Sequence, residues 1–147
     1  MKTLHFTKLI NAPAQKVWQV LWNETTYPVW TKAFNPGGSS FMQSDWQTGG
    51  KTLFLDGNGN GMVSTIKSKK EPYEIIFKHL GEISNGVEDT TSEKVKSWAG
   101  SLEEYHLKEN KGMTTLTATV QTGGEMEEMI TTGFTKGLEE VKRLSEQ

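Results

Sequence analysis

The chain has 147 residues, a formal net charge of −2, a single arginine and no cysteine. This length fits one hydrophobic core, so we expect a single domain over residues 1–147. Arg143 is the only arginine, which excludes a basic surface for binding nucleic acid. The lack of cysteine excludes a disulfide framework, and the polar start without long apolar runs predicts a cytoplasmic protein with no signal peptide or membrane span.

The first elements expected are a strand and two short helices. Residues 3–10 alternate between apolar and polar side chains, as a half-buried strand does. Pro13 suits the first position of a helix, whose apolar face includes Trp22 and which must end before Pro28. A second short helix is predicted over residues 29–34.

Six further strands are expected before the C-terminal segment. Turn residues, chiefly glycine, asparagine and proline, separate runs that have the usual length of antiparallel strands. The predicted strands cover residues 39–46, 51–56, 62–69, 73–81, 96–108 and 113–121. The polar residues 82–94 lie between two of these strands and predict a mobile loop at one rim of the sheet.

The chain is predicted to end in one long amphipathic helix after Gly124. Its apolar positions recur every three to four residues, as in a helix packed on a sheet. Gly133 and Gly137 lie near the centre of that apolar face, where each costs about 1 kcal/mol relative to alanine. Two interpretations remain open: a strand approaches the helix backbone closely, or a cavity lies beneath the helix.

This order of elements predicts an α+β fold with helices on one face of a curved antiparallel sheet of six to seven strands. Two short helices follow the first strand. Alternation within residues 73–81 directs Tyr73, Ile75, Phe77 and His79 toward the concave side. His79 is then a polar group among apolar ones, either contacting a ligand or bonded to a backbone carbonyl.

Motifs for metal binding and catalysis are weak. Residues 56–61 copy the first half of a calcium-binding loop, but position twelve is Lys67 instead of a carboxylate, so we interpret them as a strand connection. The three histidines lack the spacing of a metal site, and we expect neither a metal nor another cofactor. No nucleophile elbow or phosphate-binding glycine loop is present, so no catalytic residue is assigned.

Glu103 and Glu104 are neighbours on a predicted strand and must point to opposite faces of the sheet. They therefore cannot form an acid and base pair. One of them is expected in water. The other could enter the inner face near Tyr105, where a buried carboxyl could act as a general acid.

The chain resembles the START-like, helix-grip superfamily known as SRPBCC, in the group similar to the C-terminal domain of the activator of Hsp90 ATPase. The resemblance covers essentially the whole chain and rests on the order and spacing of short motifs. These motifs are Ile10-Asn11-Ala12-Pro13, Val17-Trp18, Trp30, Thr48-Gly49-Gly50-Lys51, Pro72-Tyr73-Glu74-Ile75-Ile76-Phe77, Trp98, Thr115-Leu116-Thr117 and Leu138-Glu139-Glu140-Val141-Lys142.

The resemblance implies a hydrophobic cavity between the sheet and the terminal helix. Our leading hypothesis is therefore the non-enzymatic binding or transport of a small hydrophobic or aromatic ligand, which apolar walls hold and a few polar groups orient. His79 is the expected polar anchor, and residues 82–94 are the expected lid. The expected wall residues are Trp30, Phe34, Trp46, Phe54, Phe77, Trp98, Tyr105, Met129 and Phe134.

Two alternatives remain open. The same cavity could serve a cyclase-like or hydratase-like enzyme that uses His79 or an inward glutamate as acid or base. The chain could instead be a protein-binding module similar to the Hsp90 activators, with a chaperone-like ATPase as partner and a concave side filled by its own side chains. An unpaired edge strand is compatible with either a monomer or a homodimer.

Overall fold

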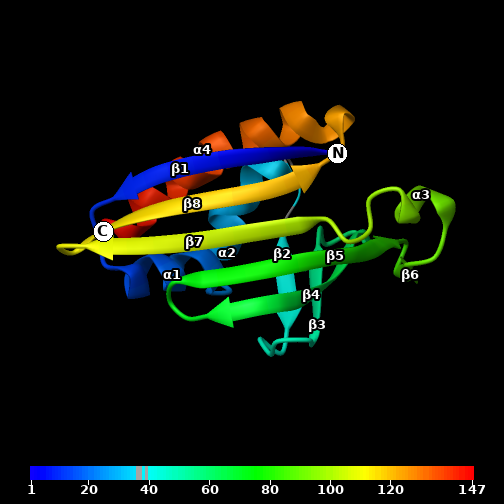
Figure 1. The fold of residues 1–147 in the computed structure, drawn as a ribbon, viewed down its shortest axis with the longest axis horizontal. Helices are drawn as coiled ribbons and strands as arrows, with labels where there is room; N and C mark the ends of the chain where they lie inside the picture. The colour runs from blue at the N-terminus through cyan, green and yellow to red at the C-terminus, as the bar shows by residue number, and fades with distance from the viewer. Residues whose placement is uncertain (36–37, 39) are drawn as a thin grey trace.

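The computed structural model describes residues 1–35, 38 and 40–147. One eight-stranded sheet dominates the fold, and α1, α2 and α4 lie on one of its faces (Figure 1). The strands are β1 (Lys2–Ile10), β2 (Phe41–Ser44), β3 (Lys51–Leu55), β4 (Gly61–Lys70), β5 (Glu74–Ser84), β6 (Val87–Asp89), β7 (Leu102–Asn110) and β8 (Met113–Thr122). The helices are α1 (Ala14–Trp22), α2 (Tyr27–Trp30), α3 (Glu93–Lys96) and α4 (Glu127–Ser145), with short 3-10 turns η1 (Thr31–Phe34) and η2 (Gly124–Met126).

The strands follow the order β1-β8-β7-β5-β4-β3-β2, and β6 pairs with β5 away from this path. All the named strand pairs are antiparallel. The predicted α+β helix-grip fold, with two short helices after the first strand and a long C-terminal helix, is confirmed. The eighth strand, β6, comes from a segment for which no strand was predicted.

The prediction of a mobile loop over residues 82–94 is wrong. β5 continues to Ser84 and returns as β6 through a tight turn at Asn85 and Gly86, whose φ angles are 51° and 79°. Asparagine followed by glycine is the preferred pair for such a hairpin turn, because both positions need positive φ. The hairpin leads into α3, which Ser92 caps by accepting a hydrogen bond from the Val95 amide.

Three other predictions about the strands need correction. The strand predicted from residue 96 begins at Leu102, so Trp98 lies in the connection between α3 and β7. Tyr73 precedes β5 and is 52% exposed, although alternation was expected to bury it. The strand predicted over residues 39–46 is shortened to β2, Phe41–Ser44, and its first residue lies outside the described part of the chain.

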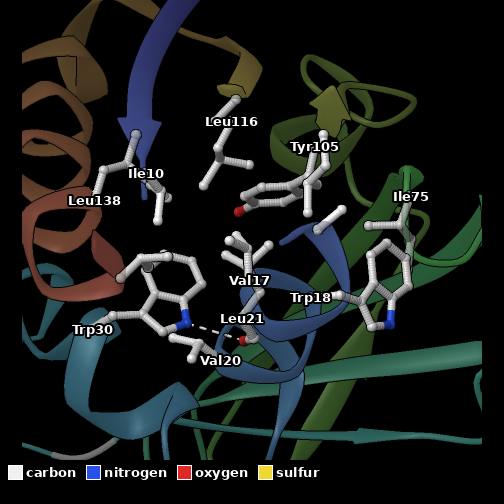
Figure 2. Close-up of a cluster of buried hydrophobic side chains, with 14 of the residues drawn as sticks. Ile10, Val17, Trp18, Val20, Leu21, Trp30, Ile75, Tyr105, Leu116 and Leu138 are labelled. Atoms are coloured by element: carbon white, nitrogen blue, oxygen red, sulfur yellow. Dashed lines mark hydrogen bonds between the residues drawn. The ribbon is translucent and has the colours of Figure 1, made fainter. Parts of the chain in front are cut away.

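The hydrophobic core lies where α1 crosses the inner face of the sheet (Figure 2). Val17 and Leu21 of α1 are fully buried there, together with Leu116 of β8. The indole nitrogen of Trp30 donates a hydrogen bond to the Leu21 carbonyl oxygen at 2.9 Å, which joins α2 to the end of α1. The buried indole thus keeps its polar atom satisfied while its rings fill the core.

Gly133 and Gly137 of α4 serve close packing, and their neighbours are α2 and η1, not a strand. A Cβ atom on Gly133 would lie 2.3 Å from the ring of Phe34. One on Gly137 would lie 2.8 Å from the carbonyl oxygen of Trp30. The prediction of a cavity opposite these two glycines is therefore wrong, because Phe34 and Trp30 occupy the space.

Replacing Gly137 by alanine is expected to lower the free energy of unfolding by about 1–3 kcal/mol, because the new methyl group overpacks the contact with the Trp30 carbonyl. This range is the net loss, which remains after a gain of about 1 kcal/mol in helix propensity is subtracted from the cost of the overpacked contact. Equilibrium unfolding in urea measures the difference. Gly124→Ala is the matched control, since nothing lies within 4 Å of its added methyl group, and it should be nearly neutral. Unchanged or increased stability of Gly137→Ala would contradict the packing interpretation.

Candidate functional site

A chain of hydrogen-bonded side chains crosses the inner face of the sheet from β4 through β5 to β7. Ser64 Oγ lies 2.6 Å from His79 Nδ1, and His79 Nε2 lies 3.0 Å from Glu103 Oε1. The Tyr105 hydroxyl donates to Glu103 Oε2. We call these four residues the Glu103 network. Because each donor takes a different carboxylate oxygen, the carboxylate is held from two sides.

Local strand geometry places each member of the Glu103 network. A register shift between Val63 and Ser64 in the β4–β5 pairing brings Ser64 opposite His79. Glu103 pairs with Phe77 across β5 and β7, so its side chain follows the buried face of both strands. Glu104 points to the other face, where it contacts His106, which confirms that the two adjacent glutamates face opposite sides.

The direction of each hydrogen bond follows from the groups involved. A carboxylate only accepts, so His79 Nε2 donates to Glu103, and Nδ1 shares a hydrogen bond with the Ser64 hydroxyl, which can either donate or accept. Burial, reinforced by the nearby charge of Glu103, raises the pKa of the Tyr105 phenol well above its usual value. Tyr105 therefore remains a donor at neutral pH, and the carboxylate receives two fixed hydrogen bonds.

Exposure within the Glu103 network decides which group a ligand could touch. His79 is only 4% exposed and Ser64 is fully buried. The Glu103 side chain is 20% exposed. Both ring nitrogens of His79 are already occupied, whereas His79 was expected to be the polar anchor itself. In the structure His79 holds Glu103 in place, and the Glu103 side chain is the more exposed of the two.

Most of the aromatic residues expected to form a ligand-binding wall lie together around this network. Phe54 contacts both Phe77 and His79, with ring centroids 5.1 and 5.7 Å apart. The connected rings from the expected set are Trp30, Phe34, Trp46, Phe54, Phe77, Tyr105 and Phe134. Met129 is 44% exposed on α4, and Trp98 lies on the connection before β7, so the structure places these two elsewhere.

Trp22 is the residue that the sequence analysis left out of the wall. Its ring lies 4.9 Å from that of Tyr105, 5.4 Å from Phe77 and 6.0 Å from Trp46, at the centre of the aromatic cluster. Its indole nitrogen is buried and has no hydrogen-bond partner among the described residues. Its place on the apolar face of the first predicted helix was the available signal, since that face must meet the sheet.

A groove of about 600 Å³ opens beside this cluster, between the corner of α1 and α2 and the edge strand β2. Its lining residues are Trp22, Asn23, Glu24, Tyr27, Pro28, Phe41, Met42, Gln43, Ser44 and Trp46. A smaller hollow of about 260 Å³ shares Trp22, Asn23 and Trp46 with it. We call the larger hollow the Trp22–Trp46 groove. It has the size of a site for a small molecule.

Trp46 reaches this groove from a strained backbone. Its φ angle is 60°, in the left-handed region that a bulky side chain rarely adopts and that costs about 1–3 kcal/mol. The Trp46 amide donates to Ser44 Oγ at 3.0 Å, and Ser44 Oγ lies 2.8 Å from Thr52 Oγ1, so two side chains hold this conformation. Strain of this kind concentrates at functional sites.

Tyr27 connects the Trp22–Trp46 groove with the Glu103 network. It lines the groove, and its ring lies 6.3 Å from that of Trp22. Burial raises the pKa of its phenol far above the usual value, and the negative charge of Glu103 raises it further.

The sequence of this chain matches a known protein family over most of its length. The family of activator of Hsp90 ATPase homolog 1-like proteins matches residues 11–144. The chain belongs to this family. None of the functionally curated proteins compared with it matches its sequence.

Solved structures share the fold of this AHSA1-like protein at low sequence identity. The Aha1 dimer from Colwellia psychrerythraea is 17% identical over 99% of this chain and 97% of its own, with a TM-score of 0.69. CalU16 from Micromonospora echinospora is 15% identical over 97% and 75%, with a TM-score of 0.66. DynU16, from the dynemicin biosynthetic locus, is 14% identical over 97% of this chain, with a TM-score of 0.67. This chain spans only 46% of DynU16.

Two further observations concern metals and membranes. The Asp56 carboxylate in the calcium-like segment accepts the backbone amides of Asn58 and Asn60, and these bonds, the one from Asn58 first, lower the pKa of that carboxyl. It therefore shapes the turn between β3 and β4. Within residues 1–35, 38 and 40–147, no cluster of three potential ligand side chains could hold a metal ion. No helix in that part of this AHSA1-like chain is long and apolar enough to cross a bilayer.

Proposed function

We propose that this AHSA1-like protein binds a small apolar or aromatic molecule in the Trp22–Trp46 groove, without transforming it. The observation that carries the proposal is Trp46, whose strained backbone directs a large ring toward Trp22 beside a hollow of about 600 Å³. Neither tryptophan belongs to the fully enclosed core. Flat rings that line a hollow bind flat guests through the apolar area removed from water.

Other features support the same function. The ring of Trp22 lines the groove, and its contacts with Phe77 and Tyr105 hold it in place there. Met42 lines the groove beside the rings, and its flexible thioether adapts to guests of different shape. The likeness to DynU16, from the dynemicin biosynthetic locus, is in keeping with a small-molecule role.

The proposal predicts that Trp46→Ala weakens binding of the neutral fluorescent probe N-phenyl-1-naphthylamine by about tenfold, since one wall of the groove is lost, equivalent to about 1.4 kcal/mol. Probe fluorescence in a titration measures the dissociation constant. Trp98→Ala removes the same side chain outside the groove and should leave binding unchanged. Absence of probe binding to the wild-type protein would contradict the proposal and favour a protein-binding module. Equal binding by wild-type and Trp46→Ala proteins would contradict the location.

A second candidate function, acid–base catalysis on the bound molecule, is favoured by the Glu103 network. Two donors fix the orientation of the Glu103 carboxylate, its side chain is 20% exposed, and a carboxylate can serve as a general base. Ser64 is fully buried and cannot serve as a nucleophile toward a substrate. Turnover of polyketide-like substrates that disappears in Glu103→Gln, while substrate binding persists, would favour this function over simple binding.

A further inference from the structure

We propose that the Trp22–Trp46 groove selects organic cations, such as aryl-alkyl amines and quaternary ammonium compounds, and disfavours aromatic anions. This inference rests on the proposed binding function and specifies the charge of the guest. Glu24, which lines the groove between α1 and α2, supplies a negative charge, and the aromatic rings of the groove supply the contact surface.

The first step is the sign of the charge on the groove wall. Glu24 is the only acidic residue that lines the groove, and within the described part of the chain no lysine, arginine or histidine lines it. The smaller hollow beside it contains Lys69, but Glu71 lines that hollow as well, so its two charges have opposite signs. A charged guest in the larger groove therefore meets a negative wall.

The second step is the availability of the Glu24 carboxylate. Glu24 is exposed, and among residues 1–35, 38 and 40–147 it has no ion-pair or hydrogen-bond partner for its side chain. Other glutamates are paired with ammonium groups, such as Glu127 with Lys2 and Glu88 with Lys51. A cationic guest therefore gains an ion pair without displacing an internal one. At an exposed carboxylate this gain is about two- to fivefold in affinity.

The third step is the position of the groove at the C-terminal end of α1. The helix ends at Trp22, and Asn23 and Glu24 of the groove wall follow it directly. The carbonyl groups at a helix C-terminus carry a partial negative charge, which favours nearby cations. The last turn of α1 contains no basic residue that would balance this charge. The helix end and Glu24 therefore act in the same direction.

The fourth step is the aromatic surface. Four of the ten lining residues are aromatic, namely Trp22, Tyr27, Phe41 and Trp46. The rings of Trp22 and Trp46 are inclined at 55° with centroids 6.0 Å apart, so the two indoles form walls of different orientation. The faces of aromatic rings attract cations, most strongly in tryptophan, and aromatic cages are a recurrent site for quaternary ammonium ions. The rings thus add to the preference that the charge of the wall creates.

The test uses three guests that share a 2-naphthylmethyl group and differ in its substituent, which is trimethylammonium, tert-butyl or carboxylate. The tert-butyl compound has the shape of the ammonium compound without its charge. Equilibrium dialysis at neutral pH measures the three dissociation constants. The wild-type protein should bind the cation at least about tenfold more tightly than the anion. Raising the salt concentration from about 10 mM to about 1 M should reduce this ratio, because the screening length falls from about 30 Å to about 3 Å.

Two variants assign the preference to this groove. Glu24→Gln keeps the shape of the side chain but not its charge, so it should weaken binding of the cation about two- to fivefold, strengthen binding of the anion and leave the tert-butyl compound unchanged. Glu128→Gln is the matched control, because it removes the same charge from an exposed position on α4 outside the groove. It should retain all three wild-type constants.

Equal affinity of the wild-type protein for the cation and the anion, with the tert-butyl compound still bound, would overturn this inference and leave the binding function intact. A preference for the cation that Glu24→Gln does not reduce would also overturn it, since the charge would then act from elsewhere. Failure of all three guests to bind would overturn the binding function itself. The wild-type comparison does not depend on the folding of a variant.

Discussion

Replacing Trp30 by alanine is expected to lower the free energy of unfolding by about 3–5 kcal/mol, the cost of removing a large aromatic side chain from a packed core. Trp30 is 2% exposed, and its indole lies between α1 and α4 (Figure 2). The substitution removes the donor to the Leu21 carbonyl and the ring that packs opposite Gly137. Both consequences act on the contact that holds α2 beneath the terminal helix.

Equilibrium unfolding in guanidinium chloride measures this loss. Trp98→Ala is the matched control, because it deletes the same side chain from the connection before β7, and it should cost much less. Trp30→Phe keeps an aromatic ring but lacks the indole N–H, so its stability should fall between those of the wild-type and Trp30→Ala proteins. A loss below about 1 kcal/mol in Trp30→Ala would show that the core does not depend on this contact.

The general architecture could be predicted because it depends on local patterns. Alternation in residues 3–10, Pro13 at the start of a helix and the long apolar period after Gly124 each determine an element within a few residues. The polarity of residues 82–94 gave the wrong result, because an exposed hairpin and a loop have similar composition. The dipeptide Asn85-Gly86 was the local signal that distinguishes them.

The role of the glycines in α4 could not be determined from the sequence. A missing side chain creates room, but the sequence does not state what fills it. Phe34 and Trp30 fill it here, and they belong to elements about a hundred residues earlier in the chain. The helix pattern was therefore sufficient to place Gly133 and Gly137 on the packed face, and insufficient to choose between a contact and a cavity.

In the candidate site, too, the local features could be predicted from the sequence, whereas the features that depend on tertiary contacts could not. His79 was expected on the inner face, and the two glutamates were expected on opposite faces so that one of them could enter it, because alternation along a strand is a local property. Their connection was not predicted, because it needs the pairing of β4, β5 and β7 and the register shift beside Ser64. The positive φ of Trp46 is likewise a tertiary feature, since no local preference places a tryptophan in that conformation.

Alkaline pH is expected to destabilise the protein steeply, because two buried tyrosines must keep their protons in the folded state. Burial, with the charge of Glu103 as a second cause, raises the pKa of Tyr27 and of Tyr105 above the value in the unfolded chain. The stabilising contribution is complete below the unfolded pKa of about 10 and decreases as the pH rises above it. Each tyrosine should then lower the free energy of unfolding by about 1.4 kcal/mol per pH unit.

Urea unfolding at intervals from pH 9 to pH 12 measures this slope, which should approach about 3 kcal/mol per pH unit for the two tyrosines together. Tyr27→Phe and Tyr105→Phe should each halve the slope, even though Tyr105→Phe also loses the hydrogen bond to Glu103 and begins from a lower stability. Tyr73→Phe is the control, because Tyr73 is exposed and should titrate alike in the folded and unfolded states. A stability that stays constant above pH 10.5 would show that the two phenols ionise as readily in the folded protein as in the unfolded chain, and would contradict the prediction.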